Sequence, residues 1–439
     1  MKNIFLIPFL LISVILRAQT LNPYSEKMQW FKDAKLGIFI HWGIYAVDGI
    51  DESWSFYNGY ISHSDYLKQL NGFTAKNYNP IYWADLIKES GARYAVLTAK
   101  HHDGVALWNT KLGNLNVVRN TPVKKGLIEP YVKAIRDKGL KVGIYYSLID
   151  WSYPDYPGFT RETTRYVDDQ KRWGNFTKYN LGQIKELSEK FNPDLFWFDG
   201  DWEHTADEWK SKEIREQILE SNPNAIINSR LNGYGDYETP EQGVPIFKPQ
   251  SKYWELCMTT NDSWGYQHND SNYKSPNQII NIFIDCISMG GNLLLDIGPK
   301  EDGTIPDEQV NVLKELGRWT KKHADAIYET NAGIPLEYYY GRTTLSKDST
   351  ILYLFVPNKQ NGTLMLKGIK NKVNRIWIVG NGTKLHYKIV GKQYWSSVPG
   401  LLYIDVPDSA LDSQVTVIAV LLDGKIDLYK EEIKKIESN

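Results

Sequence analysis

The sequence of 439 residues is too long for one small domain and favours a large domain followed by a smaller module. Lys and Arg total 51, Asp and Glu total 52, and the formal net charge is −1. This balance provides no overall field for nucleic acid or an anionic membrane surface, so polyanion binding is a poor hypothesis. The 15 Trp and 29 Tyr are many for a soluble protein. Aromatic rings suit the faces of sugars, although core packing accounts for most of them.

The first residues have the pattern of a secretory signal peptide. One lysine precedes an apolar run from Ile4 to Leu16, and the small residue Ala18 follows. We therefore expect residues 1–18 to be removed and the protein to be exported, to the periplasm or outside the cell. No later run reaches about 18 apolar residues, so no membrane helix is expected. Cys257 and Cys286 are too few for a disulfide framework, and two buried thiols are expected.

Between about residue 30 and residue 330, short apolar runs alternate with amphipathic helical stretches, which is typical of βα units around a parallel sheet. The expected strands are residues 35–42, 93–101, 140–147, 194–200, 224–230, 253–259 and 292–298. The expected helices lie within residues 82–92, 131–140, 179–191, 210–222, 277–289 and 310–328. Seven visible strands predict an α/β fold of the (β/α)8-like (TIM-type) barrel class with one strand missed or degenerate. A doubly wound sheet is the alternative topology.

After residue 330 the pattern changes to alternating strands separated by turns, such as ILYLFVP and QVTVIAVLL. This pattern predicts a C-terminal antiparallel β-sandwich. The expected organisation is a signal peptide (1–18), a catalytic barrel (19–334), a β-sandwich (335–430) and a charged tail (431–439).

Polar residues at the carboxyl ends of barrel strands tend to carry the chemistry. These positions are His41, Lys100, His101, His102, Tyr146, Asp199 and Arg230. Adjacent histidines on an extended segment point to opposite faces, which disfavours a metal site at His101 and His102. Hydrogen bonding of imidazoles to substrate hydroxyls is the favoured role, and a structural role for one of the pair stays open.

The stretch FWFDGDWE places Asp199 directly after an apolar strand. Glycoside hydrolysis needs two carboxylates, which a retaining enzyme holds about 5–5.5 Å apart. Asp201 and Glu203 are expected to be solvated or structural. Glu238 and Glu241 on a Pro- and Gly-rich loop, and Glu255 within a strand, are candidates for the second carboxylate, and spacing alone does not rank them.

The ordered set of motifs resembles the retaining α-L-fucosidases of glycoside hydrolase family 29. The matching segments are WFKDAKLGIFIHWGIYAV, RYAVLTAKHHDGVALW, GIYYSLIDW, DLFWFDGDWE, YWELCMTTNDSWGY and GGNLLLDIGPKEDGTIP. The resemblance covers nearly the whole mature chain. It implies a barrel followed by a β-sandwich, a fucosylated glycan as substrate, and no metal or cofactor.

The resemblance also implies roles for single residues. Asp199 matches the nucleophile, and the fucose-binding positions are His41, Trp54, His101, His102, Tyr146, Trp197, Arg230 and Trp264. The ESWSF spelling around Trp54 departs from the commoner pattern. Glu241 in the TPE motif matches the acid/base of several members and is preferred to Glu255, the second choice, because a proton donor must reach the leaving group.

The TPEQ and CMTTNDSWGY spellings are closer to the subgroup that acts on α-1,3/1,4 fucose branches. Two alternatives stay open: a catalytically silent fucoside-binding barrel, and a metal-dependent hydrolase built on His101 and His102. The sequence predicts neither the natural glycan nor the oligomeric state.

Overall fold

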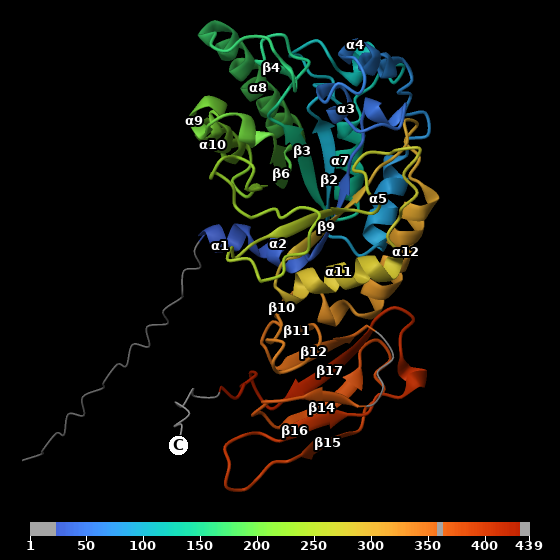
Figure 1. The fold of residues 1–439 in the computed structure, drawn as a ribbon, viewed down its shortest axis with the longest axis vertical. Helices are drawn as coiled ribbons and strands as arrows, with labels where there is room; N and C mark the ends of the chain where they lie inside the picture. The colour runs from blue at the N-terminus through green and yellow to red at the C-terminus, as the bar shows by residue number, and fades with distance from the viewer. Residues whose placement is uncertain (1–22, 358–362, 431–439) are drawn as a thin grey trace, which may run out of the picture.

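The computed structural model of the protein describes residues 23–357 and 363–430. A larger α/β body and a smaller β body are stacked along the long axis (Figure 1). The predicted signal peptide (1–18) and charged tail (431–439) lie outside the described residues. The two bodies follow each other along the chain, as the change of pattern near residue 330 predicts.

The described residues of the larger body form a seven-stranded sheet in which every pairing is parallel. Its strands are β1 (Leu36–Ile40), β2 (Tyr94–Lys100), β3 (Lys141–Ser147), β6 (Leu195–Asp199), β7 (Ile226–Ile227), β8 (Glu255–Thr259) and β9 (Asn292–Ile297). The spatial order is β7-β6-β3-β2-β1-β9-β8, which leaves β7 and β8 as the two edges. These strands match the predicted ones in number and order.

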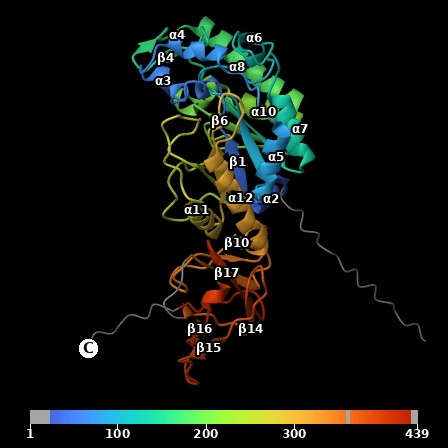
Figure 2. The same ribbon diagram turned by 90° about the vertical axis from the view of Figure 1, so that its right-hand side faces the viewer.

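The predicted helices are also present and cover the outside of the sheet. They are α5 (Pro80–Glu89), α7 (Ile128–Asp137), α8 (Gln170–Phe191), α10 (Ser211–Ser221), α11 (Pro276–Ser288) and α12 (Asp307–Lys322). Helix α11 begins with a capping box formed by Ser275 and Gln278, with Pro276 at its first position. Figure 2 shows α5 and α7 side by side outside the strands. The βα alternation predicted this layering.

Shorter elements fill the connections. They are α1 (Pro23–Lys27), α2 (Gln29–Ala34), α3 (Trp54–Tyr57), α4 (His63–Tyr66), α6 (Val117–Asn120), α9 (Ala206–Trp209) and the hairpin β4 (Gly158–Thr160) with β5 (Thr163–Thr164). Helices α3 and α4 and strand β4 gather at the end of the barrel away from the smaller body (Figure 1). That end carries the carboxyl ends of the strands, where a barrel places its functional side chains.

The gap between β7 and β8 is filled by residues 236–242. The Asp236 amide donates to the carbonyl of Ile227, and the amides of Glu238 and Gln242 donate to the carbonyls of Tyr253 and Cys257. Parallel bridges join this segment to Asn228 on one side and to Trp254 and Cys257 on the other. Pro240 has no amide hydrogen to donate, which interrupts the ladder. The segment therefore occupies the place of the degenerate eighth strand that the sequence predicts.

Alternation along the strands separates two apolar layers. Phe39, Tyr145, Trp197 and Leu294 belong to one cluster, which fills the inside of the barrel. Phe196, Phe198 and Tyr146 belong to another, which packs beneath the helices. Because neighbouring residues of a strand point to opposite faces, only every second strand residue can reach a central pocket.

The smaller body consists of two antiparallel sheets. Its strands are β10 (Asn331–Ala332), β11 (Thr343–Leu345), β12 (Ile351–Val356), β13 (Leu364–Leu366), β14 (Val373–Ile378), β15 (Tyr387–Val390), β16 (Leu401–Ile404) and β17 (Thr416–Leu422). The sheet orders are β10-β11-β12-β17-β14 and β13-β16-β15. The predicted barrel followed by an antiparallel β-sandwich is confirmed.

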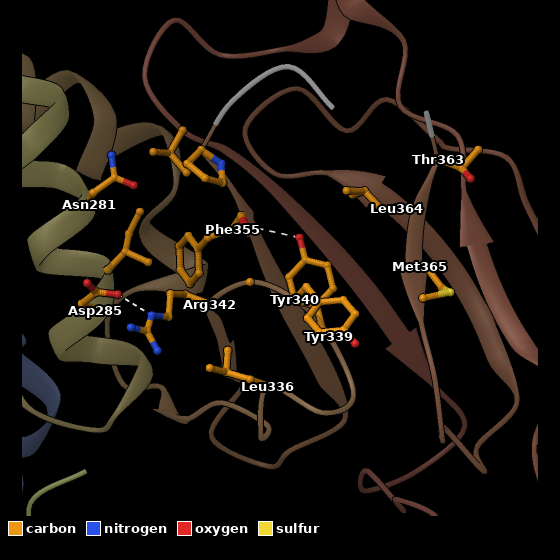
Figure 3. A pocket seen from close by; sticks show the side chains of 14 residues that line it. Asn281, Asp285, Leu336, Tyr339, Tyr340, Arg342, Phe355, Thr363, Leu364 and Met365 are labelled. Atoms are coloured by element: carbon orange, nitrogen blue, oxygen red, sulfur yellow. Dashed lines mark hydrogen bonds and ion pairs between the residues drawn. The ribbon is translucent and has the colours of Figure 1, made fainter. Parts of the chain in front are cut away.

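Polar contacts and a cavity mark the junction of the two bodies. Lys322 of α12 lies 2.6 Å from Asp412, and the indole of Trp319 donates to the carbonyl of Val415 at 2.8 Å. Arg342 donates to Asp285 of α11 beside a cavity of about 370 Å³ (Figure 3). The sandwich is thus attached to α11 and α12, at the end of the barrel opposite α3 and α4.

Cys257 and Cys286 are both free and buried, as expected. Within residues 23–357 and 363–430, no helix is both long and apolar enough to cross a membrane.

Candidate active site

One pocket collects most of the predicted site residues at the carboxyl ends of the barrel strands. Its volume is about 170 Å³, below the roughly 300–1,000 Å³ of pockets that hold drug-sized ligands. The lining residues are Phe39, His41, Trp54, His101, Tyr145, Trp197, Asp199, Trp202, Arg230, Glu241 and Trp264. Such a pocket suits a single small ring with an apolar face and several hydroxyl groups.

Asp199 is the last residue of β6 and is almost fully buried. Its Oδ1 accepts a hydrogen bond from Arg230 at 2.7 Å, and its Oδ2 accepts one from the hydroxyl of Tyr145 at 3.0 Å. The Nε2 of His102 lies 3.6 Å from Oδ2. Gly200 follows with φ of 86°, a left-handed conformation that turns the chain sharply after the strand. The carboxylate is therefore held by hydrogen bonds from Arg230 and Tyr145, with His102 close by, and it lines the pocket.

Arg230 connects Asp199 to Glu241. One terminal guanidinium nitrogen donates to Asp199 and the other donates to Glu241. Burial opposes the charge of Arg230, but the Asp199 and Glu241 carboxylates outweigh burial and raise its pKa above the ordinary value. The Glu241 side chain is 38% exposed, so it stands at the rim while Asp199 lies deeper.

Glu255, the second choice for the proton donor, does not reach the pocket. It is fully buried at the start of β8, where it accepts hydrogen bonds from the indole of Trp197 at 3.2 Å and from Tyr94. Burial raises the pKa of its carboxyl to about 7. Glu255 holds the pocket residue Trp197 through its indole. Glu241 is the carboxyl group at the mouth of the pocket.

Two histidines, His41 and His101, line the pocket and a third, His102, lies beside Asp199; each has a partner on its Nδ1 atom. That atom lies 2.7 Å from Asp296 in His41, 2.5 Å from Ser53 in His101 and 2.6 Å from Ser147 in His102. Burial lowers the pKa of His41 and His101 well below the ordinary value and that of His102 to about 3. Neutral imidazoles donate or accept hydrogen bonds, which suits binding to hydroxyl groups.

Aromatic rings form the remaining walls. The ring of Trp264 lies 4.9 Å from His41, and the Arg230 guanidinium lies 4.6 Å above Trp197. Trp54 and Trp202 stack with centroids 6.5 Å apart, and Trp202 is 53% exposed. Trp54, which the sequence matches only loosely, is therefore a wall of the pocket, and Trp202 forms part of the rim.

Tyr146, which was predicted to bind fucose, does not line the pocket. Its hydroxyl lies 2.6 Å from Asn180 and 3.0 Å from Gln183 of α8, and it accepts from Lys100 at 3.0 Å. Strand alternation turns Tyr146 to the outer face, and the preceding Tyr145 faces the pocket. The pocket position belongs to Tyr145.

His102 is absent from the pocket lining, although it approaches the inner side of Asp199. Asp201 and Glu203 are structural, as expected. Asp201 accepts from the amide of Asn232 at 3.2 Å, and Glu203 accepts from Tyr156. Among the described residues, no group of three His, Cys, Asp or Glu is placed to hold a metal ion.

Three lining residues were missed in the sequence: Phe39, Tyr145 and Trp202. Phe39 and Tyr145 both lie two residues before a strand-end polar residue, so counting back in steps of two from His41 and Ser147 finds them. Trp202 lies in the turn after β6, where no periodicity gives the direction of a side chain.

The sequence matches the α-L-fucosidase family over residues 17–325. A tissue α-L-fucosidase of Macaca fascicularis is 29% identical, with 91% of each chain covered. An α-L-fucosidase of Branchiostoma floridae is 32% identical, over 69% of this chain and 72% of the relative.

Solved structures of α-L-fucosidases are also similar to this chain. The α-L-fucosidase isoenzyme 1 of Paenibacillus thiaminolyticus is 34% identical, with a TM-score of 0.84 over 92% of this chain and 100% of that chain. A family 29 α-L-fucosidase of Bacteroides thetaiotaomicron, trapped as a covalent intermediate with 2-fluoro-fucosyl fluoride in a Glu-to-Gln mutant, is 27% identical, with a TM-score of 0.81 over 90% of this chain and 96% of that chain. The pocket, the barrel with its sandwich and these similarities together show that the chain belongs to the α-L-fucosidase family, glycoside hydrolase family 29.

Proposed function

We propose that the protein is an exported, retaining exo-α-L-fucosidase that releases L-fucose from fucosylated oligosaccharides or glycoconjugates. The observation that supports this most directly is the pair of carboxylates, Asp199 and Glu241, at the two ends of one guanidinium. Two carboxylates that share a guanidinium lie close together. Retaining glycosidases need a separation of about 5–5.5 Å, against roughly 6.5–9.5 Å in inverting enzymes.

The first step of the mechanism forms a bond between Asp199 and the anomeric carbon of fucose. As this bond forms, the bond from the carbon to the glycosidic oxygen breaks, and the oxygen takes the proton of Glu241. The products are a fucosyl ester on Asp199 and the shortened glycan. The bonds from Arg230 and Tyr145 orient the carboxylate before the attack.

The second step reverses the roles. The Glu241 carboxylate takes a proton from water while the water oxygen attacks the anomeric carbon, and the ester bond to Asp199 breaks. Two inversions give L-fucose with the original anomeric configuration. Both carboxyl groups return to their starting protonation states, so no cofactor is needed.

The other residues hold the sugar. His41 and His101 present their free nitrogens to hydroxyl groups, while Trp264 and Trp54 offer apolar surface to the C6 methyl group. His102 lies beside Asp199, 3.6 Å from its Oδ2. The volume of about 170 Å³ supports removal of one terminal sugar at a time.

The preference for α-1,3/1,4 branches and the export are parts of the same proposal. The first is supported by the TPEQ and CMTTNDSWGY spellings, and the second by the apolar run from Ile4 to Leu16.

The test is to incubate the mature protein with an activated aryl α-L-fucoside and follow the released sugar by proton NMR. The first product is expected to be the α-anomer of L-fucose, before mutarotation. The β-anomer first would show inversion and contradict the proposal. A protein that binds the fucoside and releases no fucose would support the silent binding barrel instead.

Tyr145→Phe is expected to lower kcat/KM for an aryl fucoside by about ten-fold or more, the scale for loss of a hydrogen bond to a charged group. The matched control is Tyr146→Phe, which removes a hydroxyl from the outer face and should lower the melting temperature with kcat/KM retained. Steady-state kinetics and thermal melting of both variants provide the check. The opposite ranking of activities would show that Tyr146 serves the site.

A further inference from the structure

The catalytic pocket leaves most of a branched glycan outside it. Its volume of about 170 Å³ accommodates one sugar ring, and Asp199 closes its inner end. The sugars attached to fucose must therefore lie on the surface around the mouth. Trp54 and Trp202 both line the pocket and continue as a stacked pair toward solvent.

An aromatic wall connects the pocket to a neighbouring groove. Trp54 is the first residue of α3 and Tyr57 is the last, and their rings meet edge to face at 5.5 Å. Both rings contact Trp151, at 5.0 Å from Trp54 and 3.9 Å from Tyr57. One face of this short helix thus belongs to the pocket and the next to the groove.

The groove lies between α3, the start of α4 and strand β4, with a volume of about 710 Å³. Tyr57, Tyr60 and Phe159 provide aromatic surface, and Tyr60 is 70% exposed. Polar groups for hydroxyls come from Asn58, Ser64 and Glu162. Rings beside amide, hydroxyl and carboxylate groups suit neutral sugars, which have an apolar face and a polar edge.

The walls of the groove are fixed to the barrel. The amide of Arg161 donates to the carbonyl of Tyr57 at 2.8 Å, and His63 lies 2.8 Å from the hydroxyl of Ser152. Arg165 donates to the carbonyls of Gly158 and Trp151 at 2.5 and 2.6 Å. The groove is therefore preformed, which lowers the entropy cost of binding a flexible chain.

We propose that this groove binds the neutral sugars to which the terminal fucose is attached, with the exposed ring of Tyr60 stacking on one of them. The proposal rests on the proposed fucosidase activity and adds the site of the leaving glycan to it. In this arrangement the sugars of an oligosaccharide contact Tyr60, and the aryl group of an aryl fucoside does not.

The test compares Tyr60→Ala with the wild type on two substrates, an activated aryl α-L-fucoside and a fucosylated branched oligosaccharide. We expect kcat/KM for the oligosaccharide to fall about three- to ten-fold through KM, the scale of one lost ring contact, while the aryl fucoside is unaffected. Inhibition by the same oligosaccharide without fucose should weaken by a similar factor. Retained aryl fucoside turnover also shows that the variant is folded.

Tyr340→Ala is the matched control, because Tyr340 is 77% exposed and lies at the junction cavity at the far end of the barrel (Figure 3). Tyr340→Ala should leave kcat/KM unchanged for both substrates. If Tyr60→Ala behaves like Tyr340→Ala, or loses activity equally on both substrates, the groove is not the binding site. If the wild type hydrolyses neither fucoside, the proposed function itself fails.

Discussion

Asp199→Ala is expected to lower kcat for every α-L-fucoside by on the order of 10⁴-fold or more, the scale for removal of a covalent nucleophile. Among the described carboxylates near the pocket, neither Asp201 nor Glu241 is placed to take its role. Asp201 accepts from the Asn232 amide, and Glu241 stands at the rim. The measurement is the initial rate with an activated aryl fucoside, at enzyme concentrations high enough to detect residual activity.

Adding azide as an external nucleophile tests the role of Asp199 more specifically. The space vacated by the carboxylate lies between Arg230 and Tyr145, on the face from which the anomeric carbon is attacked. Azide should form a bond to that carbon as the aryloxide leaves, which gives a β-fucosyl azide and restores part of the rate. Asp201→Ala is the control and should retain most activity. Full activity of Asp199→Ala without azide would assign the nucleophile elsewhere.

Glu241→Ala is expected to lower kcat/KM for oligosaccharides by about 10²- to 10⁴-fold, the range for loss of a general acid. An activated aryl fucoside should lose much less in the first step, because its leaving group departs without a proton. Kinetics across a series of leaving groups of increasing basicity would show a steeper dependence in the variant than in the wild type. An equal loss across the series would contradict a role in protonation.

Glu255→Gln is the matched control, and its effect should appear in stability. Burial raises the pKa of Glu255 from 4.5 in the unfolded chain to about 7 in the fold. The folded state therefore binds one proton more between these values. The stability from this group is present below the lower value and is lost as the pH rises through the upper one.

The melting temperature of Glu255→Gln should accordingly fall less than that of the wild type between about pH 5 and about pH 8. The variant should be less stable overall, because an amide offers one oxygen where Tyr94 and Trp197 both donate. The same fall in both proteins would contradict the raised pKa. A leaving-group dependence in Glu255→Gln, with none in Glu241→Ala, would make Glu255 the proton donor.

Much of the site follows from one rule applied to the sequence. Polar residues after apolar strands lie at the same end of a parallel barrel, which brings His41, His101 and Asp199 into one pocket. The rule fails at Tyr146 because it locates the end of a strand and ignores which face each residue takes. Ser147 contacts His102 from the inner face, so the phase of β3 assigns Tyr145 to the pocket.

The eighth strand position could not be predicted from periodicity. The stretch GDYETPEQG has no apolar alternation, and Pro240 and two glycines resemble a loop. It is extended because its neighbours, Asn228 on one side and Trp254 and Cys257 on the other, offer unpaired backbone groups at the two open edges. Pairing partners that are distant in the sequence determine this conformation, and the local sequence pattern carries no information about them.

The backbone pairing of residues 238–242 with β8 also bears on how such enzymes can diverge. Glu241 is fixed by the amides of Cys257 and Gln242 on either side of it, and the chain from Gly243 to Lys252 only returns to the strand. Insertions or deletions in that return would leave Glu241, the proposed proton donor, in register. Residues 243–252 are thus free to change in length, while the carboxyl group of Glu241 keeps its place.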